Sequence, residues 1–396
     1  MEKSVSLAGI EHCTGCSACH DACPHSSIEM KCGDSIHTYP LIDKDTCVSC
    51  GLCMRVCPVL NPKSHNVVQQ KYYMAWHQDE NERKTSTSGG AGAALVSTAL
   101  SMGWYVCGAA MDDAFELKHI VTSQEQESKR LKGSKYLQSD TRGVFKRIKE
   151  LASDGSHILF FGTPCQVEGL MNYLSDKAKE NVLTCGIICH GVNSPLVWKD
   201  YKSWLEKYNR SELKEYNFRS KTKGWQNSRG GGNLRVYYRF RDDKVVDEPA
   251  WHNLFHWWFG HHYILRPSCL NCPYRKEQRN SDLTIGDFWN IERVNPNADT
   301  FKGVSAIITS SEPGESFLHS CNNLDYELVD AQKSKQVLKG FIEKQTQDYR
   351  KSEVAKELLF EKEYITEGFD HMRNVYPAQT VLSHYTWLLK NKMGIK

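Results

Sequence analysis

Two copies of one cysteine pattern, C-x2-C-x2-C-x3-C-P, stand close together near the start of the chain. The first copy runs from residue 13 to residue 24 and the second from residue 47 to residue 58. In such a run, three cysteines two residues apart bind one iron-sulfur cluster, and the fourth, before the proline, binds the other cluster. The sequence therefore predicts two 4Fe-4S clusters. The first would be held by Cys13, Cys16, Cys19 and Cys57, and the second by Cys47, Cys50, Cys53 and Cys23.

The same cysteines could instead form a zinc module or a disulfide knot. Zinc sites use two well-separated C-x2-C pairs instead of four cysteines in one run, so the spacing favours clusters. Residues 8–62 also resemble the bacterial two-cluster ferredoxins. That resemblance implies one-electron transfer and names no substrate.

Length, charge and cysteine content limit what the remaining chain can do. With 396 residues the chain is too long for a ferredoxin alone. The 50 Lys and Arg balance 47 Asp and Glu, which argues against nucleic acid and an anionic membrane as partners. Sixteen cysteines and an N-terminus without an apolar signal core predict a cytoplasmic protein. The uncharged stretch 89–111 breaks at Gly103, so we expect no membrane span.

Alternating strand and helix patterns after residue 68 predict an α/β core. Cys165 and Cys189 each follow an apolar strand. Because ligands gather at the carboxyl ends of strands in open α/β sheets, these two cysteines could face one site. The pair Cys269 and Cys272 could be half of a zinc site, a redox dithiol or half of a cluster. Cys185, inside a strand, is expected to be a buried thiol.

Three further segments leave alternatives open. The glycine-rich turn in residues 83–95 (RKTSTSGGAGAAL) suits a pyrophosphate, or it is an ordinary helix start with close packing. Residues 218–221 (FRSK) could meet a ligand, although a solvated hairpin edge is the preferred interpretation. The histidine-rich stretch 251–263 lacks helical metal spacing, which favours core packing.

Seven motifs occur in one order along the chain. They are RKTSTSGGAGAAL, GSKYLQS, GTPCQVEGL, CHGVNSPLVWKDY, FRSKTKGW, CLNCPYR and SDLTIGDFW. Together they resemble the family of beta subunits of coenzyme F420 hydrogenase and dehydrogenase over roughly residues 68–310. The resemblance implies an FAD that exchanges a hydride with a carrier and single electrons with clusters.

The resemblance also implies which residues bind these groups. A third 4Fe-4S cluster beside the flavin would be held by Cys165, Cys189, Cys269 and Cys272. The FAD-binding residues would be Ser88, Gly89, Gly90, Ser134, Lys135, Tyr136, Gly286 and Asp287. Asp287 could equally cap a local turn. Apart from the resemblance, we expect a substrate pocket beside the flavin bordered by Lys135, His190 and Arg219, with Lys135 and His190 as the catalytic residues.

The expected fold is α+β, in three parts. Residues 1–65 form a bacterial-ferredoxin-like domain with two clusters. Residues 68–310 form an α/β mixed-sheet domain that binds FAD and a 4Fe-4S cluster, and residues 311–396 form a helical C-terminal extension.

The expected function is that of an FAD-dependent iron-sulfur oxidoreductase. Electrons would pass between the ferredoxin-type clusters and FAD, and from FAD to or from an F420-like hydride carrier or an organic substrate. The alternative is an electron-transfer subunit that relays electrons to a separate catalytic partner. Expected partners are ferredoxin or another redox protein, and a second copy of the chain or a partner subunit.

Overall fold

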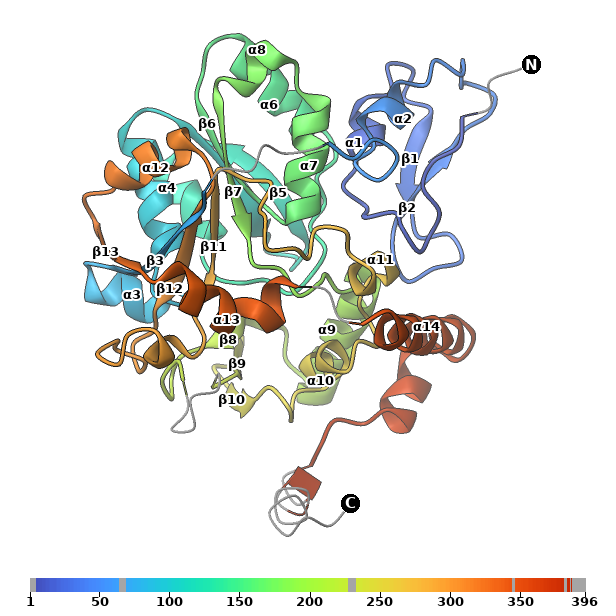
Figure 1. Cartoon of the computed structure of the whole chain (residues 1–396). Coiled ribbons are helices and arrows are strands. Elements are labelled where there is room, and N and C mark those ends of the chain that lie inside the picture. Colours follow the sequence, from blue (N-terminus) through green and yellow to red (C-terminus); the bar gives the residue numbers. More distant parts are fainter. Residues whose placement is uncertain are drawn as a thin grey trace.

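The computed structural model describes residues 5–63, 69–226, 233–343, 346–380, 383, 384 and 386. A small N-terminal segment packs beside a large mixed sheet, and the long C-terminal helix lies below that segment (Figure 1). We call residues 5–63 the ferredoxin segment. Its elements are α1 (Ala18–Asp21), β1 (Ile28–Lys31), β2 (Tyr39–Ile42) and α2 (Leu52–Val56).

The main sheet has eight strands in the order β13-β3-β12-β11-β7-β6-β4-β5. In that order they span Leu324–Val329, Lys71–His77, Ser305–Thr309, Leu283–Asp287, Val182–Ile187, Ile158–Gly162, Tyr105–Met111 and Leu117–Thr122. Strands β11, β7, β6 and β4 run parallel, while the outer strands join antiparallel. The carboxyl ends of the four parallel strands therefore lie along one edge of the sheet.

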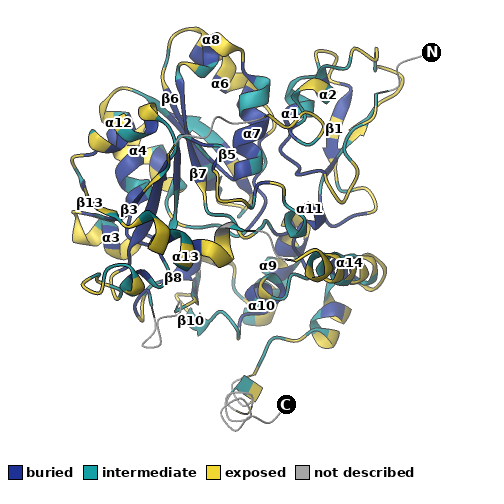
Figure 2. Cartoon of the chain, in the orientation of Figure 1, coloured by how far each residue is buried: buried dark blue, intermediate teal, exposed yellow. Residues whose placement is uncertain are grey.

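Alternate side chains of these strands face opposite layers, as the period of two in a strand requires. Leu159 and Leu183 pack with helices α4 (Ala91–Ser101) and α12 (Glu312–His319) on one face. Ile158 and Phe160 pack with α6 (Val144–Ser153) and α7 (Pro164–Tyr173) on the other. Figure 2 shows the strands dark blue between helices with exposed outer surfaces.

A second, three-stranded sheet lies below the carboxyl edge. Its strands are β8 (Leu213–Ser220), β9 (Arg235–Phe240) and β10 (Val245–Pro249). The helices around it are α9 (Pro195–Asn209), α10 (Leu254–Gly260), α11 (Pro267–Leu270), α13 (Ala331–Ile342) and α14 (Gln347–Val375). The remaining short elements are α3 (Glu80–Thr85), α5 (Glu125–Ser128), η1 (Lys129–Leu131), α8 (Asp176–Lys179) and η2 (Ile291–Arg293).

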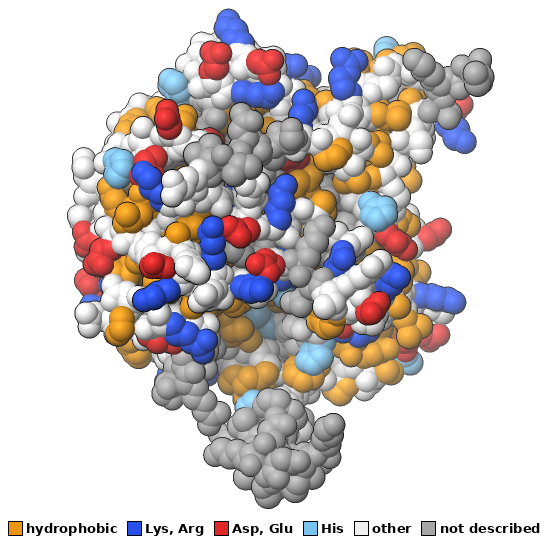
Figure 3. All heavy atoms as spheres, viewed as in Figure 1, with side chains coloured by type: hydrophobic (Ala, Val, Ile, Leu, Met, Phe, Trp, Pro, Cys, Tyr) orange, Lys and Arg blue, Asp and Glu red, His pale blue; other side chains and the backbone are white. Residues whose placement is uncertain are grey.

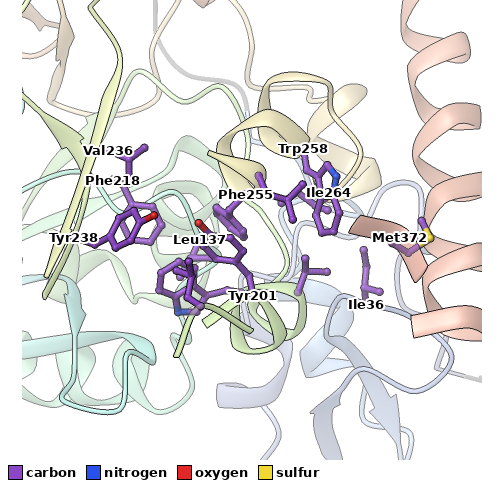
Figure 4. Packing of buried hydrophobic residues seen from close by; sticks show 14 of the residues in the cluster. Ile36, Leu137, Tyr201, Phe218, Val236, Tyr238, Phe255, Trp258, Ile264 and Met372 are labelled. Carbon is purple, nitrogen blue, oxygen red and sulfur yellow. The ribbon is translucent and has the colours of Figure 1, made fainter. Parts of the chain in front are cut away.

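One hydrophobic core joins segments that are far apart in the sequence. Ile36 of the ferredoxin segment, Trp258 of α10 and Met372 of α14 belong to the same buried cluster (Figure 4). Burial at about 25 cal/mol per Å² of apolar surface stabilises this contact. The tail and the ferredoxin segment are therefore packed against the sheet domain through a shared hydrophobic core.

The mixed α/β architecture with a ferredoxin-like N-terminal region agrees with the sequence. The expected helical extension over residues 311–396 is not purely helical, because β13 lies within it and pairs with β3 at the edge of the main sheet. Within the described residues, no helix is both long and apolar enough to cross a bilayer. On the face drawn in Figure 3, basic and acidic side chains are interspersed.

Candidate redox site

The ferredoxin segment brings together the cysteines that its spacing predicts. One cavity is lined by all four residues expected to hold the first cluster, Cys13, Cys16, Cys19 and Cys57. Burial raises the pKa of the Cys16 thiol to about 12, with smaller contributions from neighbouring cysteines. Four thiols that line one cavity give up their protons together only when a cation compensates the charge, as iron does in a cluster.

Three cysteines expected to hold the second cluster also lie close to one another. Burial raises the pKa of Cys53, and the charges of Cys23 and Cys50 raise it further. Cys50 is exposed, whereas Cys53 is buried. Cys47 is partly buried in the loop before α2. The second group therefore lies nearer the solvent than the first.

The cysteines expected to hold a third cluster converge from three segments. Cys165 lies in the first turn of α7, and Cys189 follows β7. Cys269 lies in α11, and Cys272 follows it. Burial raises the pKa of Cys189 to about 12, and the next causes are the charges of Cys165 and Cys272. The pKa of Cys269 is raised by burial and by the other three cysteines.

Local structure explains why these segments meet. Thr163 and Gln166 form a capping box that starts α7 directly after β6, which sets Cys165 at the carboxyl edge of the sheet. Asn280 donates from Nδ2 to the carbonyl oxygen of Pro164 at 2.9 Å, which ties the loop after Cys272 to the same turn. The strand-end rule indicated that Cys165 and Cys189 could face one site. The structure brings the two cysteines close enough for the charge of Cys165 to raise the pKa of Cys189.

The first and third cysteine groups are neighbours. The Cys165 charge contributes to the raised pKa of Cys16. The hydroxyl of Tyr274 donates to the carbonyl oxygen of Pro58 at 3.1 Å. The charges of Cys165 and Cys16 both contribute to the raised pKa of this tyrosine. Two of the predicted cluster sites therefore adjoin across the contact between the ferredoxin segment and α7.

No three His, Cys, Asp or Glu side chains of the described chain converge on a point that suits a single metal ion. A cubane cluster spreads its four thiolates over four separate irons, so this finding concerns mononuclear sites.

The glycine-rich turn lies at the same edge of the sheet and is tightly packed. A Cβ on Gly89 would lie 2.3 Å from the Ala75 carbonyl oxygen, and Gly90 has a φ of 95°. The Gly89 amide donates to Ser305 Oγ at 3.0 Å, and the Ser88 hydroxyl donates to the Val304 carbonyl oxygen at 2.7 Å. Close packing thus explains both glycines, which was one of the two alternatives for this turn.

Several cations surround the turn. Lys221 Nζ donates to the carbonyl oxygens of Ser88 and Arg83, at 2.5 and 2.6 Å. Burial lowers the pKa of Lys221 to about 7, and the nearby charge of Arg83 lowers it further. The potential at this turn is therefore positive, which favours an anionic group.

Ser134 and Lys135 lie beside the same turn. The Ser134 amide donates to Thr87 Oγ1 at 2.8 Å. Lys135 Nζ donates to the carbonyl oxygens of Ala109, Arg130 and Leu131, at 2.8 to 3.0 Å. Burial lowers the pKa of Lys135 to about 7, with a further contribution from Arg130. The ammonium group of Lys135 therefore donates hydrogen bonds to three backbone carbonyl oxygens.

Tyr136 and Asp287 form a different part of the edge, around Arg219. Asp287 accepts from Trp225 Nε1 at 2.6 Å and lies 3.8 Å from Arg219 Nη2. The Tyr136 ring packs edge-on against Phe218. Arg219 is only 2 % exposed, so the preferred interpretation of residues 218–221 as a solvated hairpin edge is wrong. Arg219 Nε and Nη2 have no hydrogen-bond partner among the described residues.

Gly286 is the residue before Asp287 in β11. A Cβ at this position would lie 2.8 Å from Cβ of Ile188, so glycine is needed for strand packing. Gly286 and Asp287 were both expected to bind FAD, but only Asp287 has a polar side chain at this edge of the sheet.

His190 belongs to a histidine pair that the sequence did not reveal. His190 Nε2 lies 2.9 Å from His262 Nε2, and His262 Nδ1 lies 2.6 Å from Glu353 Oε2 of α14. Burial lowers the pKa of His190 to about 4, with contributions from His262 and Arg275. His262 thus differs from His256, which is buried and contacts the Phe218 carbonyl oxygen as a core residue.

Comparison with known proteins assigns two parts of the chain. Residues 155–334 match the family model for the C terminus of the coenzyme F420 hydrogenase/dehydrogenase beta subunit. Residues 12–61 match a 4Fe-4S dicluster domain, and a second dicluster model matches residues 39–90. The resemblance expected from the motifs is thus confirmed over residues 155–334, and the expected ferredoxin segment over residues 12–61. The matched region begins inside the expected central domain and runs past its expected end at residue 310.

One curated relative and one solved structure are also similar to the chain. The F subunit of the F(420)H(2) dehydrogenase of Methanosarcina mazei is 24% identical over 193 residues, which cover 46% of this chain and 54% of the relative. The match thus spans about half the length of that relative. A chain of the F420-reducing NiFe hydrogenase complex of Methanosarcina barkeri aligns over 78% of this chain and 96% of its own length. Its TM-score is 0.44 and its sequence identity is 16%.

Proposed function

We propose that this member of the family of F420 hydrogenase/dehydrogenase beta subunits is an iron-sulfur flavoprotein oxidoreductase with three 4Fe-4S clusters and one FAD. The observation that carries the proposal is the adjacency of the first and third cysteine groups through Cys16 and Cys165. With Cys50 of the second group exposed, the three groups would form a path from the surface to the carboxyl edge of the main sheet. Such a path suits single electrons.

The twelve proposed ligands divide into three sets. The first cluster would be held by Cys13, Cys16, Cys19 and Cys57, the second by Cys47, Cys50, Cys53 and Cys23, and the third by Cys165, Cys189, Cys269 and Cys272. Cysteine ligation, hydrogen bonds to sulfur and solvent exposure set the potential of each cluster. The exposed Cys50 favours the second cluster as the point where a ferredoxin or another redox protein delivers or collects electrons.

The residues at the carboxyl edge fit an FAD. The positive potential around Ser88, Gly89 and Gly90 suits a pyrophosphate, with Lys221 and Arg83 as the nearest cations. The unpartnered nitrogens of Arg219, close to Asp287, suit a polar group of a ligand at the same edge. Gly89 would contribute by allowing close packing, because Ser305 already accepts its amide hydrogen.

A bound FAD would connect two-electron hydride chemistry with one-electron cluster chemistry. The chain's own contribution is to fix position and exclude water. Lys135 holds the ends of β4 and η1 together through its three carbonyl contacts, which shapes the turn containing Ser134 and Tyr136. His190, beside Cys189, is the titratable side chain that we propose to exchange a proton with a substrate at this edge.

A second candidate function is electron relay to a separate catalytic subunit. The relative in Methanosarcina mazei is described as a dehydrogenase subunit, which favours a partner. The two functions share the cluster path and differ in whether this chain binds the organic substrate or an F420-like hydride carrier.

The decisive experiment measures iron, sulfide and extracted flavin on one anaerobically purified sample. About twelve irons and one FAD per chain are expected, the sum for three cubane clusters and one flavin. About eight irons without flavin would overturn the proposal.

A pair of variants tests the third cluster separately. Cys269→Ala should lower the iron content by about one cluster's share, since it removes one of four thiolates. Cys321→Ala is the matched control, because Cys321 is a buried thiol that contacts the Phe317 carbonyl oxygen. Equal iron in the two variants would contradict the assignment.

A further inference from the structure

A cavity of about 180 Å³ lies between the third cysteine group and the tail helices. Cys269 and Cys272 form part of its wall, whereas Cys165 and Cys189 do not line it. Tyr349, Arg350 and Glu353 of α14 line the opposite side. The cavity thus adjoins the proposed third cluster on the side of Cys269 and Cys272. A cavity of about 150 Å³ can hold a benzene-sized molecule, so this volume suits a small organic ligand.

Two arginines give the cavity its charge. Arg275 donates from Nη2 to the Gly340 carbonyl oxygen at 2.9 Å, and Arg350 donates from Nη1 to Asn271 Oδ1. The Nε atoms of both arginines are buried and have no hydrogen-bond partner within the described chain. An unpaired buried donor on a charged group is destabilising, so each Nε favours an acceptor. Arginine binds carboxylates through paired N–H groups along such an edge.

The acidic residue of the cavity does not fill this role. Glu353 Oε2 contacts His262 Nδ1 and Lys356 Nζ, each at 2.6 Å. Its carboxylate is thereby directed to a histidine and a lysine, away from the two guanidinium groups. Among the described residues that line the cavity, Glu353 is the only carboxylate, so the two arginines leave an excess of positive charge.

The two histidines of the cavity wall, His190 and His262, are held in place by hydrogen bonds. Because Glu353 accepts the Nδ1 hydrogen of His262, Nε2 of neutral His262 is an acceptor, and His190 Nε2 donates to it. The two imidazoles are thus satisfied by one another and by Glu353. They form a polar wall that leaves the arginines as the groups in need of an acceptor.

We propose that this cavity binds the carboxylate group of a small organic acid, with Arg275 and Arg350 as its anchors. The acid would be the organic substrate of the site described above, and in that respect the proposal rests on the proposed function. Arg350 and Tyr349 belong to α14, outside the region that matches the family model. Residues of the tail would therefore determine which class of substrate this chain binds.

Calorimetric titration of the anaerobically purified holoprotein with succinate tests the proposal. Wild-type protein should bind succinate, and Arg350→Gln and Arg275→Gln should each weaken binding by at least about tenfold, since a hydrogen bond to a charged group contributes about 1.5–3 kcal/mol. Arg373→Gln, a half-buried position on the same helix that is paired with Asp370 and does not line the cavity, should bind as wild type does.

Further titrations identify the recognised group. Succinamide, which lacks the charge, should not bind, and inorganic phosphate should bind more weakly than succinate. Absence of succinate binding, equal affinity in Arg350→Gln, or a preference for phosphate would each overturn the proposal. Iron and flavin contents are measured on the same samples. Normal contents without succinate binding would refute only this inference, whereas succinate binding by protein that lacks flavin would refute only the proposed function.

Discussion

The guanidinium group of Arg266 donates from Nε to the carbonyl oxygen of Cys13 at 2.7 Å, across the boundary between the ferredoxin segment and the sheet domain. The same side chain donates to the Thr38 carbonyl oxygen at 2.8 Å and lies 3.7 Å from Cys13 Sγ. Its own carbonyl oxygen accepts from the Cys269 amide at 2.8 Å. One fully buried residue thus contacts a proposed ligand of the first cluster and a proposed ligand of the third.

Replacing Arg266 with Gln should loosen the ferredoxin segment. The substitution leaves buried carbonyl oxygens without a donor, at a cost of about 1–3 kcal/mol for each. We expect a lower midpoint of thermal unfolding and slower reduction of the proposed third cluster by reduced ferredoxin. Arg147→Gln, at an exposed position, is the control. Unchanged unfolding and reduction rates would show that Arg266 does not connect the two parts.

Gly169 sets how closely α7 approaches the first cluster. A Cβ on Gly169 would lie 2.9 Å from Cys16 Sγ, a distance that forces either α7 or the cysteine to move. Gly169→Ala should therefore lower the iron content or the stability of the ferredoxin segment, although alanine favours helices by up to about 1 kcal/mol. Iron analysis and thermal unfolding measure the two effects.

Gly92→Ala is the matched helical control. Its added Cβ would lie 3.4 Å from Ile285 Cδ1, an ordinary contact, so the gain in helix propensity should dominate. If both variants keep full iron and gain stability, close packing at Cys16 is not needed for the cluster.

Local patterns predicted that Cys13, Cys16, Cys19 and Cys57 would lie together, because that information lies within two short runs of sequence. The grouping of Cys57 with Cys13 follows from the spacing of two adjacent runs. The meeting of Cys165 and Cys189 follows from the topology of an α/β sheet, in which strand ends share an edge. The buried thiol of Cys185, fully enclosed in β7, is also confirmed.

Contacts between distant segments could not be predicted in the same way. The contact between His262 and Glu353 joins residues 91 positions apart, and the sequence of the tail contains no motif that indicates a binding site. Arg219 appeared to be an edge residue because charged residues protect exposed strands, yet the packing of β8 under the main sheet buries it. Strand β13 was missed because mixed charged and apolar residues favoured a helix there. In each case tertiary packing overrode the local pattern.

Lys135 offers a test of the proposed flavin site. Lys135→Ala removes the donor of three backbone contacts, which should open the turn beside Ser134 and weaken flavin retention. The ratio of flavin to protein after gel filtration measures the effect. Lys129→Ala is the control, since Lys129 is exposed and pairs with Glu125. Wild-type flavin content in Lys135→Ala would remove Lys135 from the set of flavin-positioning residues.

Glu357 of α14 should make the protein less stable as the pH rises. Its side chain is fully buried, and both carboxyl oxygens lack hydrogen-bond partners among the described residues. Burial raises its pKa to about 9, and the nearby charge of Glu361 raises it further, while Arg266 lowers it. His37 lies 3.9 Å away, and burial lowers the pKa of that imidazole well below its usual value. The pair is therefore an uncharged acid beside an uncharged imidazole at neutral pH.

The sign of the pH dependence follows from proton linkage. Between the ordinary carboxyl pKa near 4.5 and a pKa of about 9, the folded protein keeps the Glu357 proton and the unfolded chain loses it. The free energy of unfolding then falls by up to about 1.4 kcal/mol per pH unit from this group. Glu357→Gln should remove this contribution and unfold at a higher temperature than wild type at pH 8, with the difference shrinking toward pH 5. Glu363→Gln, near the exposed His371, should leave the slope unchanged. A Glu357→Gln variant that keeps the wild-type slope of stability against pH between 5 and 8 would mean that the carboxyl group is ionised in the folded protein.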